Sequence, residues 1–495
     1  MSWRVAGIFF ALGVLTRVPF QTEFLWAHDS VLYARAIERF DPLDQRPQAP
    51  GYLYYVLLIR AIDWVVGDPN RAMTIVSLVA GAAAVALLYL FAARLYDERT
   101  ARASGAFLLT AVTFWAYGGL AYPYTLLAAL SIGCALLFWL ALRAETGRGP
   151  RLALATAAYG VAIGFRADLA VFLAPLWVMA ATATPLLWTL GCALLGALLV
   201  VGWFFATAAM DGGVETLIEA MRVQAKFIDE RYSVFGDLGL RALYGNVYEL
   251  TRFLGRGLYF LAALLVAVPL SAAARRIELS DRRRFAFVLL WTLTPLAIYI
   301  PIHVGEYGYA FSMLPGLCVI AARGAIALAR GARMPRLLPW VVAGVALANA
   351  AVFLATDTPL SARDVMRRDR GVSERIERLN QADLAGATII SAYDGLVVLY
   401  YFSEDPRLST NHVIFTYDPA LPPRDYVFTT QICNRPGDAC RDRDPVVVVW
   451  DDLIRVSGDG WQELRMPHGA KLRVLRNVAN GTKIVVKGMS VDLQR

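Results

Sequence analysis

The sequence has little charge and few metal ligands. Only 18% of its 495 residues are charged and 58% are hydrophobic, whereas soluble domains carry about 25% charged residues. With four histidines and five cysteines, a multi-histidine metal site is poorly supplied. There is no P-loop, HExxH, GxSxG or CxxC motif, so an ATP-driven pump, a zinc protease and a serine hydrolase have no local support. This composition excludes an ordinary soluble protein.

Long hydrophobic runs dominate the chain instead. Apolar stretches of about 17–25 residues, each able to cross about 30 Å of hydrocarbon, recur from residue 3 to about 355 and then stop. The predicted fold class is an α-helical polytopic membrane protein with a small C-terminal α/β domain, divided into residues 1–355 and 356–495. We predict about eleven transmembrane helices, near residues 4–21, 72–93, 103–118, 123–142, 152–164, 169–182, 185–207, 256–273, 285–302, 309–329 and 337–355.

The net charge of +8 indicates topology rather than a nucleic-acid partner. Most arginines lie in short loops between predicted spans, which is the positive-inside pattern. The loops ARLYDERTAR, ALRAETGRGPR, AARRIELSDRRR and ARGARMPR then all face the cytoplasm. The first span is followed by no small-residue cleavage site, so we interpret it as a retained anchor rather than as a signal peptide.

Two long segments, residues 22–71 and 208–255, then remain on the outer side. Within the first, the stretch 51–68 contains Arg60 and Asp63, each of which would cost about 2.5–3.5 kcal/mol at the centre of a span. We therefore predict an interfacial helix there. Both segments show helical periodicity, and loops of this length are usually functional.

The chain changes character after about residue 357. Short β-like runs (ATIISAY, VIFTY, YVFTT, VVVVW and KIVVKG) accompany one charged helical stretch, DVMRRDRGVSERIERLN, which predicts an α/β domain on the outer side. In an oxidising compartment Cys433 and Cys440 could close a short disulfide loop, although two free thiols are an equal alternative. The cysteines within spans, Cys134, Cys192 and Cys318, are expected to be packing residues.

Asp29 is the first candidate for chemistry. It precedes the amphipathic pattern SVLYARAIERF, and one interpretation is a helix N-cap that accepts a backbone N–H. A cap would also hold the carboxylate in a fixed orientation at the membrane surface, as a general base requires. The neighbouring His28 is a weaker candidate for a direct role.

Two further polar clusters lie at outer ends of predicted spans. His303, Glu306, Tyr307 and Tyr309 crowd one turn. They could be an ordinary interfacial turn, but ionisable groups at lipid depth are expensive and usually line a site. Arg166 and Asp168 form a short hairpin between two spans. They could pair with each other, or Arg166 could contact a phosphate or a sugar.

Nine cations lie in or beside the predicted outer segments. Most are expected to extend towards lipid headgroups without specificity. An anionic lipid substrate would need one or two of them. They are Arg17, Arg35, Arg46, Arg222, Lys226, Arg231, Arg241, Arg252 and Arg256.

The order of these features resembles the GT-C superfamily of membrane glycosyltransferases, in the branch of protein O-mannosyltransferases and the lipid A aminoarabinose transferase. Asp29 followed by Tyr33, Ala34 and Arg35 is similar to the acid that heads the family's first surface helix. The resemblance covers residues 1 to about 355.

Three other stretches carry the same resemblance. QAPGYLYYVLL is similar to the second surface helix, GFRAD to the family's Gly-x-Arg-Pro-Asp hairpin, and HVGEYGYAFSMLPG to its outer turn. Two departures are visible: Ser30 stands where many relatives have a second acid, and Gln48 and Ala49 stand at a basic or His-Pro position. Arg35 or Arg46 could supply the missing positive charge.

The resemblance implies transfer of a sugar from a polyprenyl-phosphate donor to a protein, lipid or glycan acceptor, with inversion. Asp29 would be the base, and arginine or lysine side chains would hold phosphate. No cofactor is implied, and a divalent cation is compatible but not indicated. The expected location is a bacterial inner membrane, with the site facing the periplasm. The implied substrate-binding residues are His28, Tyr33, Arg35, Arg46, Arg166, Asp168, His303, Glu306 and Tyr307.

A lipid-linked sugar flippase or a secondary transporter is the alternative. Transporters place ionisable groups near the bilayer midplane, often with internal repeats and broken helices. In this sequence no repeat is evident, and the polar clusters fall at outer ends of spans. The pattern therefore favours the transferase.

Overall fold

The structure, a computed structural model, forms two compact units. The helical unit comprises Met1–Thr22 and Leu32–Val365, and the C-terminal unit comprises Glu23–Val31 and Met366–Arg495. A short piece of the first outer segment thus belongs to the C-terminal unit. The described residues are 2–270, 281–331, 333–384, 387–391, 395–404, 412–415, 426–431, 446–450, 460–476, 482–486 and 489–494.

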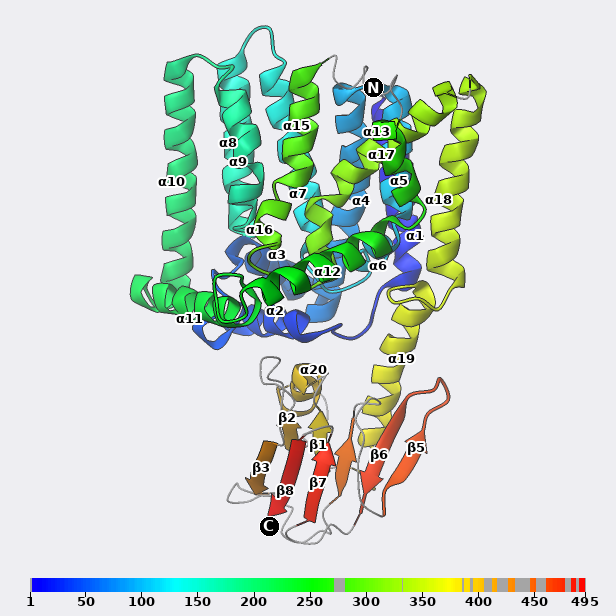
Figure 1. The fold of residues 1–495 in the computed structure, drawn as a ribbon. Helices are drawn as coiled ribbons and strands as arrows, with labels where there is room; N and C mark the ends of the chain where they lie inside the picture. Colours follow the sequence, from blue (N-terminus) through cyan, green and yellow to red (C-terminus); the bar gives the residue numbers. More distant parts are fainter. Residues whose placement is uncertain are drawn as a thin grey trace. The chain divides into compact units, whose positions relative to one another are not determined.

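Apolar helices build the helical unit, in which α1, α5 and α7 pack around α4 (Figure 1). Asp68, Asp97 and Asp281 begin α4, α5 and α15 by accepting the N–H of the third residue that follows, which satisfies donors that a helix start leaves unpaired. The α-helices are α1 (Trp3–Arg17), α2 (His28–Glu38), α3 (Leu53–Val66), α4 (Pro69–Leu95), α5 (Glu98–Thr110), α6 (Val112–Tyr117), α7 (Tyr124–Leu142), α8 (Arg148–Phe165), α9 (Leu169–Ala181), α10 (Leu186–Met210), α11 (Val214–Tyr232), α12 (Leu240–Leu258), α13 (Leu261–Leu270), α15 (Arg282–Leu293), α16 (Leu296–Tyr299), α17 (Leu314–Gly331) and α18 (Leu338–Ala355). Short helical turns are η1 (Val18–Phe20), η2 (Pro42–Asp44), η3 (Tyr307–Ser312) and η4 (Pro335–Leu337).

The chain is an integral membrane protein, but the number of predicted spans is not confirmed. Within the described residues, six helices are long and apolar enough to cross a membrane: α1 with η1, α4, α7, α10, α17, and α18 with η4. A seventh is counted if α12 and α13, which are bent by 101°, form one span. Other predicted spans correspond to α5, α8, α9 and α15, which are shorter or less apolar.

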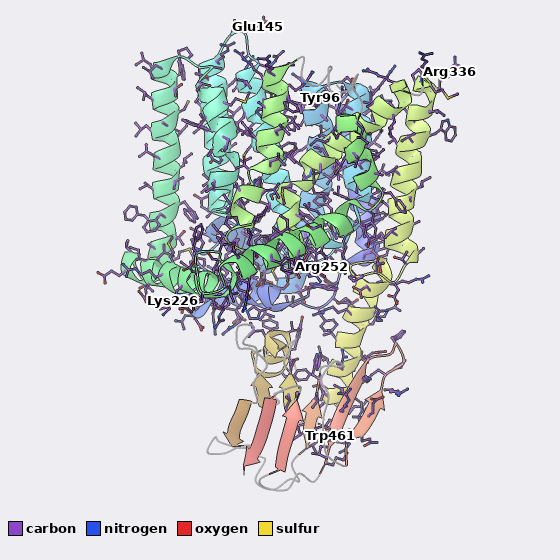
Figure 2. All side chains as sticks on the ribbon, in the orientation of Figure 1. Tyr96, Glu145, Lys226, Arg252, Arg336 and Trp461 are labelled. Carbon is purple, nitrogen blue, oxygen red and sulfur yellow. The ribbon has the colours of Figure 1, made fainter. Side chains whose placement is uncertain are left out.

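Polar segments separate to the two ends of the helical unit. Tyr96, Glu145 and Arg336 lie at one end, whereas Lys226 and Arg252 lie at the other (Figure 2). At this second end α11 and α12 lie across the long helices (Figure 1). The two helices therefore form a surface layer beside the ends of the long helices.

The stretch 51–68 contains a single helix, α3. Arg60 donates from Nε to the Ile37 carbonyl at 2.8 Å and from Nη2 to the Ala36 carbonyl at 2.9 Å. The guanidinium of Arg60 therefore donates to carbonyl groups near the end of α2, where a helix has unpaired acceptors. This accounts for an arginine inside an otherwise apolar run.

The C-terminal unit is an α/β structure, as predicted. In one sheet β1 is parallel to β2 and β4, while β6 is antiparallel to β4 and β5; in the other, β8 is parallel to β3 and antiparallel to β7. The charged stretch forms a helix, and Cys433 and Cys440 lie outside the described residues. The elements are α19 (Ala362–Leu379), β1 (Thr388–Ser391), α20 (Gly395–Leu399), η5 (Tyr400–Glu404), β2 (His412–Phe415), β3 (Tyr426–Gln431), β4 (Val447–Val449), β5 (Gln462–Arg465), β6 (Lys471–Leu475), β7 (Thr482–Val486) and β8 (Met489–Gln494).

Candidate active site

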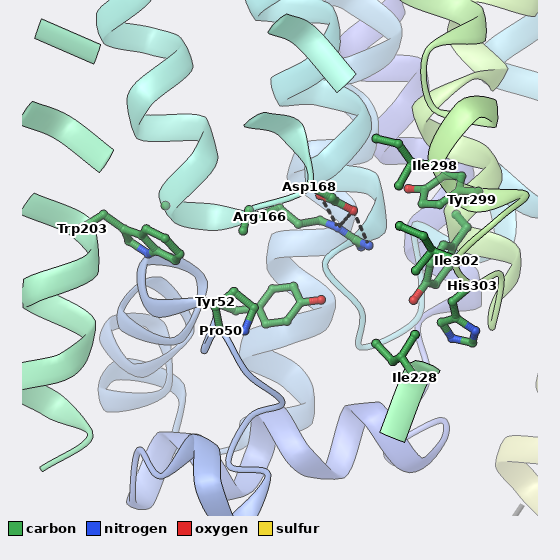
Figure 3. Close-up of a pocket in the computed structure, with 13 residues that line it drawn as sticks. Pro50, Tyr52, Arg166, Asp168, Trp203, Ile228, Ile298, Tyr299, Ile302 and His303 are labelled. Carbon is green, nitrogen blue, oxygen red and sulfur yellow. Dashed lines mark hydrogen bonds and ion pairs between the residues drawn. The ribbon is translucent and has the colours of Figure 1, made fainter. Parts of the chain in front are cut away.

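A cavity of about 200 Å³ lies in the helical unit. Its wall combines the chain before α3, the turn between α8 and α9, and parts of α10, α11, α16 and η3 (Figure 3). Most of the wall is apolar or aromatic, with a few polar groups, which is the usual composition of a ligand site. The lining residues are Pro50, Tyr52, Gly164, Arg166, Ala167, Asp168, Trp203, Ile228, Ile298, Tyr299, Ile302, His303 and Tyr309.

Arg166 and Asp168 form an ion pair in this wall (Figure 3). Nε of Arg166 donates to both carboxylate oxygens, at 3.1 and 3.0 Å, and Nη2 lies 2.9 Å from Oδ2. The arginine side chain is 6% exposed and the aspartate 25%. Burial disfavours the cation, but the carboxylate outweighs it and raises the pKa of Arg166. The pairing that the sequence offered as one alternative is present, and a contact of Arg166 with a phosphate or a sugar stays a prediction.

The turn that carries this pair depends on a glycine. α8 ends at Phe165, and Arg166 is extended, with φ −154° and ψ 107°. A Cβ atom at Gly164 would lie 2.2 Å from the ring of Tyr54, so only glycine lets α3 and α8 approach this closely. The close approach brings the chain before α3 and the turn to the same cavity wall.

Three tyrosine rings enclose the guanidinium of Arg166. Its carbon lies 4.7 Å from the ring centre of Tyr124, 5.5 Å from that of Tyr309 and 5.9 Å from that of Tyr52. Desolvated cation–π contacts of this kind contribute about 2 kcal/mol. This aromatic cage could not be predicted from the sequence, because its rings come from separate elements and tyrosine is ordinary near a membrane surface.

His303 lines the same cavity. Its ring centre lies 4.3 Å from that of Tyr232 and 5.6 Å from that of Tyr309. Within the described residues its buried Nδ1 has no hydrogen-bond partner. Burial lowers the pKa of His303 to about 4, so the imidazole is neutral at pH 7. A neutral ring can accept or donate one hydrogen bond to a polar group in the cavity.

Glu306 and Tyr307 contact other elements. Glu306 accepts a hydrogen bond at 3.1 Å from the hydroxyl of Tyr117. Arg256 of α12 donates to the hydroxyl of Tyr307, and the guanidinium carbon of Arg252 lies 5.9 Å from the same ring. The structure therefore places two of the nine outer cations, Arg252 and Arg256, beside the predicted outer turn.

The turn that contains Glu306 and Tyr307 lies between the cavity and the α12 arginines, defined as Arg252 and Arg256. Tyr117, which donates to Glu306, lies 5.8 Å from Tyr124 between ring centres, and Tyr124 lies 5.8 Å from Tyr309. The turn beginning at His303 therefore contacts the cavity at one end and the α12 arginines further along. An anion held by these arginines would lie beside the cavity wall.

The predicted residues of α2 divide between the two units. His28 and Asp29 are the first two residues of the helix and belong to the C-terminal unit, whereas Tyr33 and Arg35 belong to the helical unit. Asp29 therefore lies within the first turn rather than at the N-cap, because the helix begins at His28, one residue before Asp29. A carboxylate there is still stabilised by the helix dipole.

The remaining predicted contacts lie near the chain before α3. Arg35 and Arg46 both approach Asp44, at 3.7 and 2.7 Å, so this carboxylate offsets their charge. The ring of Tyr33 packs at 5.3 Å from that of Tyr52, a cavity residue. Tyr33 thus packs against a residue of the cavity wall without lining the cavity itself. Among described residues, no cluster of three or more His, Cys, Asp or Glu could hold a metal ion.

Comparison with solved structures identifies the fold. A scan with models of known protein families gave no match, and neither did a search of curated proteins. ArnT from Cupriavidus metallidurans bound to undecaprenyl phosphate matches with a TM-score of 0.54 and 13% identity, over 97% of this chain and 99% of that chain. ArnT in the apo state matches with a TM-score of 0.54 and 12% identity, over 96% and 98%.

An archaeal enzyme matches less of its own length. The Archaeoglobus fulgidus oligosaccharyltransferase in the apo form has a TM-score of 0.49 and 13% identity, over 85% of this chain and 65% of that chain. The match to ArnT, which spans nearly both chains, confirms the predicted GT-C resemblance at the level of the fold.

Proposed function

We propose that the protein is an inverting glycosyltransferase that moves a sugar from a polyprenyl-phosphate donor to a protein, lipid or glycan acceptor. The observation that carries the proposal is a cavity walled by the buried Arg166 and its partner Asp168, with the α12 arginines beside it, in the fold of an enzyme solved with undecaprenyl phosphate. The proposed setting is the periplasmic face of a bacterial inner membrane.

The α12 arginines are the proposed phosphate contacts. When the sugar–phosphate bond breaks, negative charge grows on the phosphate, and fixed cations stabilise that charge. Arg256 and Arg252 both lie against Tyr307, which fixes their position. Lying across the ends of the long helices (Figure 1), α12 suits a donor whose lipid tail stays in the bilayer.

Asp29 is the proposed base. The acceptor's hydroxyl or amine attacks the anomeric carbon opposite the phosphate and gives its proton to the carboxylate, while the bond to phosphate breaks and polyprenyl phosphate leaves. One base suffices for this single displacement. Asp168 is neutralised by Arg166, so we assign it, with His303 and Glu306, to orienting the sugar or the acceptor.

The test uses the full chain in proteoliposomes with a panel of radiolabelled undecaprenyl-phosphate sugars and candidate acceptors. Release of undecaprenyl phosphate together with a labelled acceptor supports the proposal. Movement of intact donor between leaflets without release would establish a flippase instead. Adding EDTA to the same assay tests the proposal that no metal is required, which predicts a rate within about twofold of the untreated sample.

A further inference from the structure

Residues Glu23–Val31 belong to the C-terminal unit, although the residues before and after them belong to the helical unit. This segment contains the proposed base, Asp29. Its contacts with the rest of the C-terminal unit involve the main chain of four consecutive residues, Glu23 to Trp26. The segment is therefore held by its backbone, directly before the helix on which Asp29 lies.

Asp369 of α19 provides the largest part of this attachment. Its two carboxylate oxygens accept the backbone N–H of Glu23, at 3.1 and 3.0 Å, and Oδ1 also accepts that of Phe24 at 3.1 Å. Hydrogen bonds to an ionised acceptor are roughly twice as strong as neutral ones. The backbone N–H groups of Glu23 and Phe24, which lie outside helices and strands, are thus both bound by the side chain of Asp369.

Tyr401 and Arg368 continue the attachment along the segment. The Tyr401 hydroxyl accepts the N–H of Leu25 at 2.7 Å, and its ring packs edge-on against Phe24, with 5.4 Å between ring centres. Arg368 donates from Nη2 to the carbonyl of Trp26 at 2.9 Å, and its guanidinium carbon lies 4.9 Å from the Trp26 ring. Helix α2 begins two residues later, at His28.

We propose that Asp369, Tyr401 and Arg368, which we call the loop clamp, are positioning residues for the transfer reaction. They fix the main chain from Glu23 to Trp26, and this fixes the direction in which α2 starts and hence the carboxylate of Asp29. The C-terminal unit, to which Asp29 itself belongs, then supplies the residues that position the base. This role rests on the proposed function, since it requires Asp29 to be the base.

The clamp has a chemical rationale in the need for precise geometry. A base acts only within hydrogen-bond reach of the proton that it removes, and a misplacement of about 1 Å can cost about 10²-fold in rate. Loops are the most mobile parts of a protein. A loop that leads to a base therefore benefits from hydrogen bonds that fix its main chain.

Hydrogen–deuterium exchange on the full chain in nanodiscs tests whether the clamp exists. Asp369→Ala removes the acceptors of Glu23 and Phe24, so exchange at residues 23–25 should accelerate at least tenfold while that of α4 stays unchanged. Asp383→Ala is the matched control, because Asp383 forms exposed ion pairs with Arg378 and Arg476 in the same unit. Unchanged exchange at residues 23–25 in Asp369→Ala would overturn the proposal.

Kinetics test whether the clamp positions the base. With the undecaprenyl-phosphate sugar that the wild type uses, Asp369→Ala should lower kcat about tenfold or more and leave the donor KM within twofold. Asp369→Asn, which keeps one acceptor oxygen, should give an intermediate kcat, and Tyr401→Phe, which keeps the ring packing, a smaller loss. Faster exchange at residues 23–25 with an unchanged kcat would refute positioning.

The two measurements separate this inference from the function on which it rests. If the wild type releases no undecaprenyl phosphate, the proposed function fails and the positioning role fails with it. Exchange at residues 23–25 then still decides whether the clamp exists. If the wild type is active and only the clamp variants behave like the control, the function stands and the positioning role is wrong.

Discussion

The turn from Arg166 to Asp168 and the segment from Glu23 to Val31 each present an acid, but they are held differently. Asp168 pairs at 2.9 Å with an arginine two residues away, which the rings of Tyr124 and Tyr309 enclose. The segment with Asp29 is bound by side chains that follow their partners by 346 and 376 positions in the sequence. One acid is positioned by its neighbours, the other by a remote part of the chain.

This difference suits two chemical roles. A carboxylate that shares three close contacts with a buried guanidinium is held in a fixed position, which suits orientation of a substrate. An acid in the first turn of a helix, directly after a loop whose main chain is held by the loop clamp, is fixed by contacts that leave its own carboxylate out, which suits a base.

Asp29→Asn should have the largest effect on activity. The substitution removes the base but keeps size and polarity, and loss of a general base typically costs about 10²–10⁴ in rate. Release of undecaprenyl phosphate in proteoliposomes measures it. Glu38→Gln, at the exposed end of the same helix, should be neutral. A near-wild-type rate in Asp29→Asn, together with a severe loss in Asp168→Asn, would exchange the roles of the two acids.

Arg166→Ala should have the largest effect on stability. It leaves the Asp168 carboxylate without its partner in the cavity wall. Breaking a fully buried pair costs about 3–5 kcal/mol, and because the Asp168 side chain is 25% exposed we expect a loss at or below the lower end of that range. Arg378→Ala breaks an exposed pair in the C-terminal unit and should cost less than about 1 kcal/mol. Denaturant unfolding in detergent compares them. Equal losses of unfolding free energy in Arg166→Ala and Arg378→Ala would mean that the cavity pair is solvated. The double variant Arg166→Ala with Asp168→Ala should recover part of the stability that Arg166→Ala loses.

Arg256→Gln should weaken donor binding more moderately. Loss of one charged phosphate contact is expected to raise the donor KM about tenfold, equivalent to about 1.4 kcal/mol. Arg241→Gln is the control, because Arg241 is an exposed arginine on the same helix. Donor-titration kinetics distinguish the two. The same KM in both variants would remove the α12 arginines from the phosphate site.

The smallest expected effect is the pH dependence that His303 contributes. The unfolded chain protonates this histidine below about pH 6.5, whereas the folded protein does so only near pH 4. Because the unfolded state then binds more protons, the free energy of unfolding falls as pH drops from about 6.5 to about 4. The Tm of wild type minus that of His303→Gln should fall over that window. A difference that does not vary with pH would show that His303 is not buried in its neutral form.

Much of the fold was predictable because apolar runs and strand patterns are local. The helices and the C-terminal α/β unit follow from them, but α9 has only 13 residues, so hydropathy alone did not settle the number of spans. Strands β5 and β6 escaped prediction because their charged residues hide the alternation.

The contacts of the candidate site were likewise predictable only where they are local in the sequence. The Arg166–Asp168 pair could be anticipated because its members are two residues apart in one turn. The tyrosine cage and the pairing of Arg256 with Tyr307 could not, because their members come from different helices. The loop clamp was the least predictable feature, since no local pattern links Glu23 to Asp369.

The most direct test of the central claim is a count of undecaprenyl phosphate released by the reconstituted full chain from its preferred undecaprenyl-phosphate sugar. We expect one molecule released for each sugar that appears on the acceptor, and a release rate lower by about 10²–10⁴-fold in Asp29→Asn. Donor that crosses the bilayer intact, with no undecaprenyl phosphate released, would contradict the central claim.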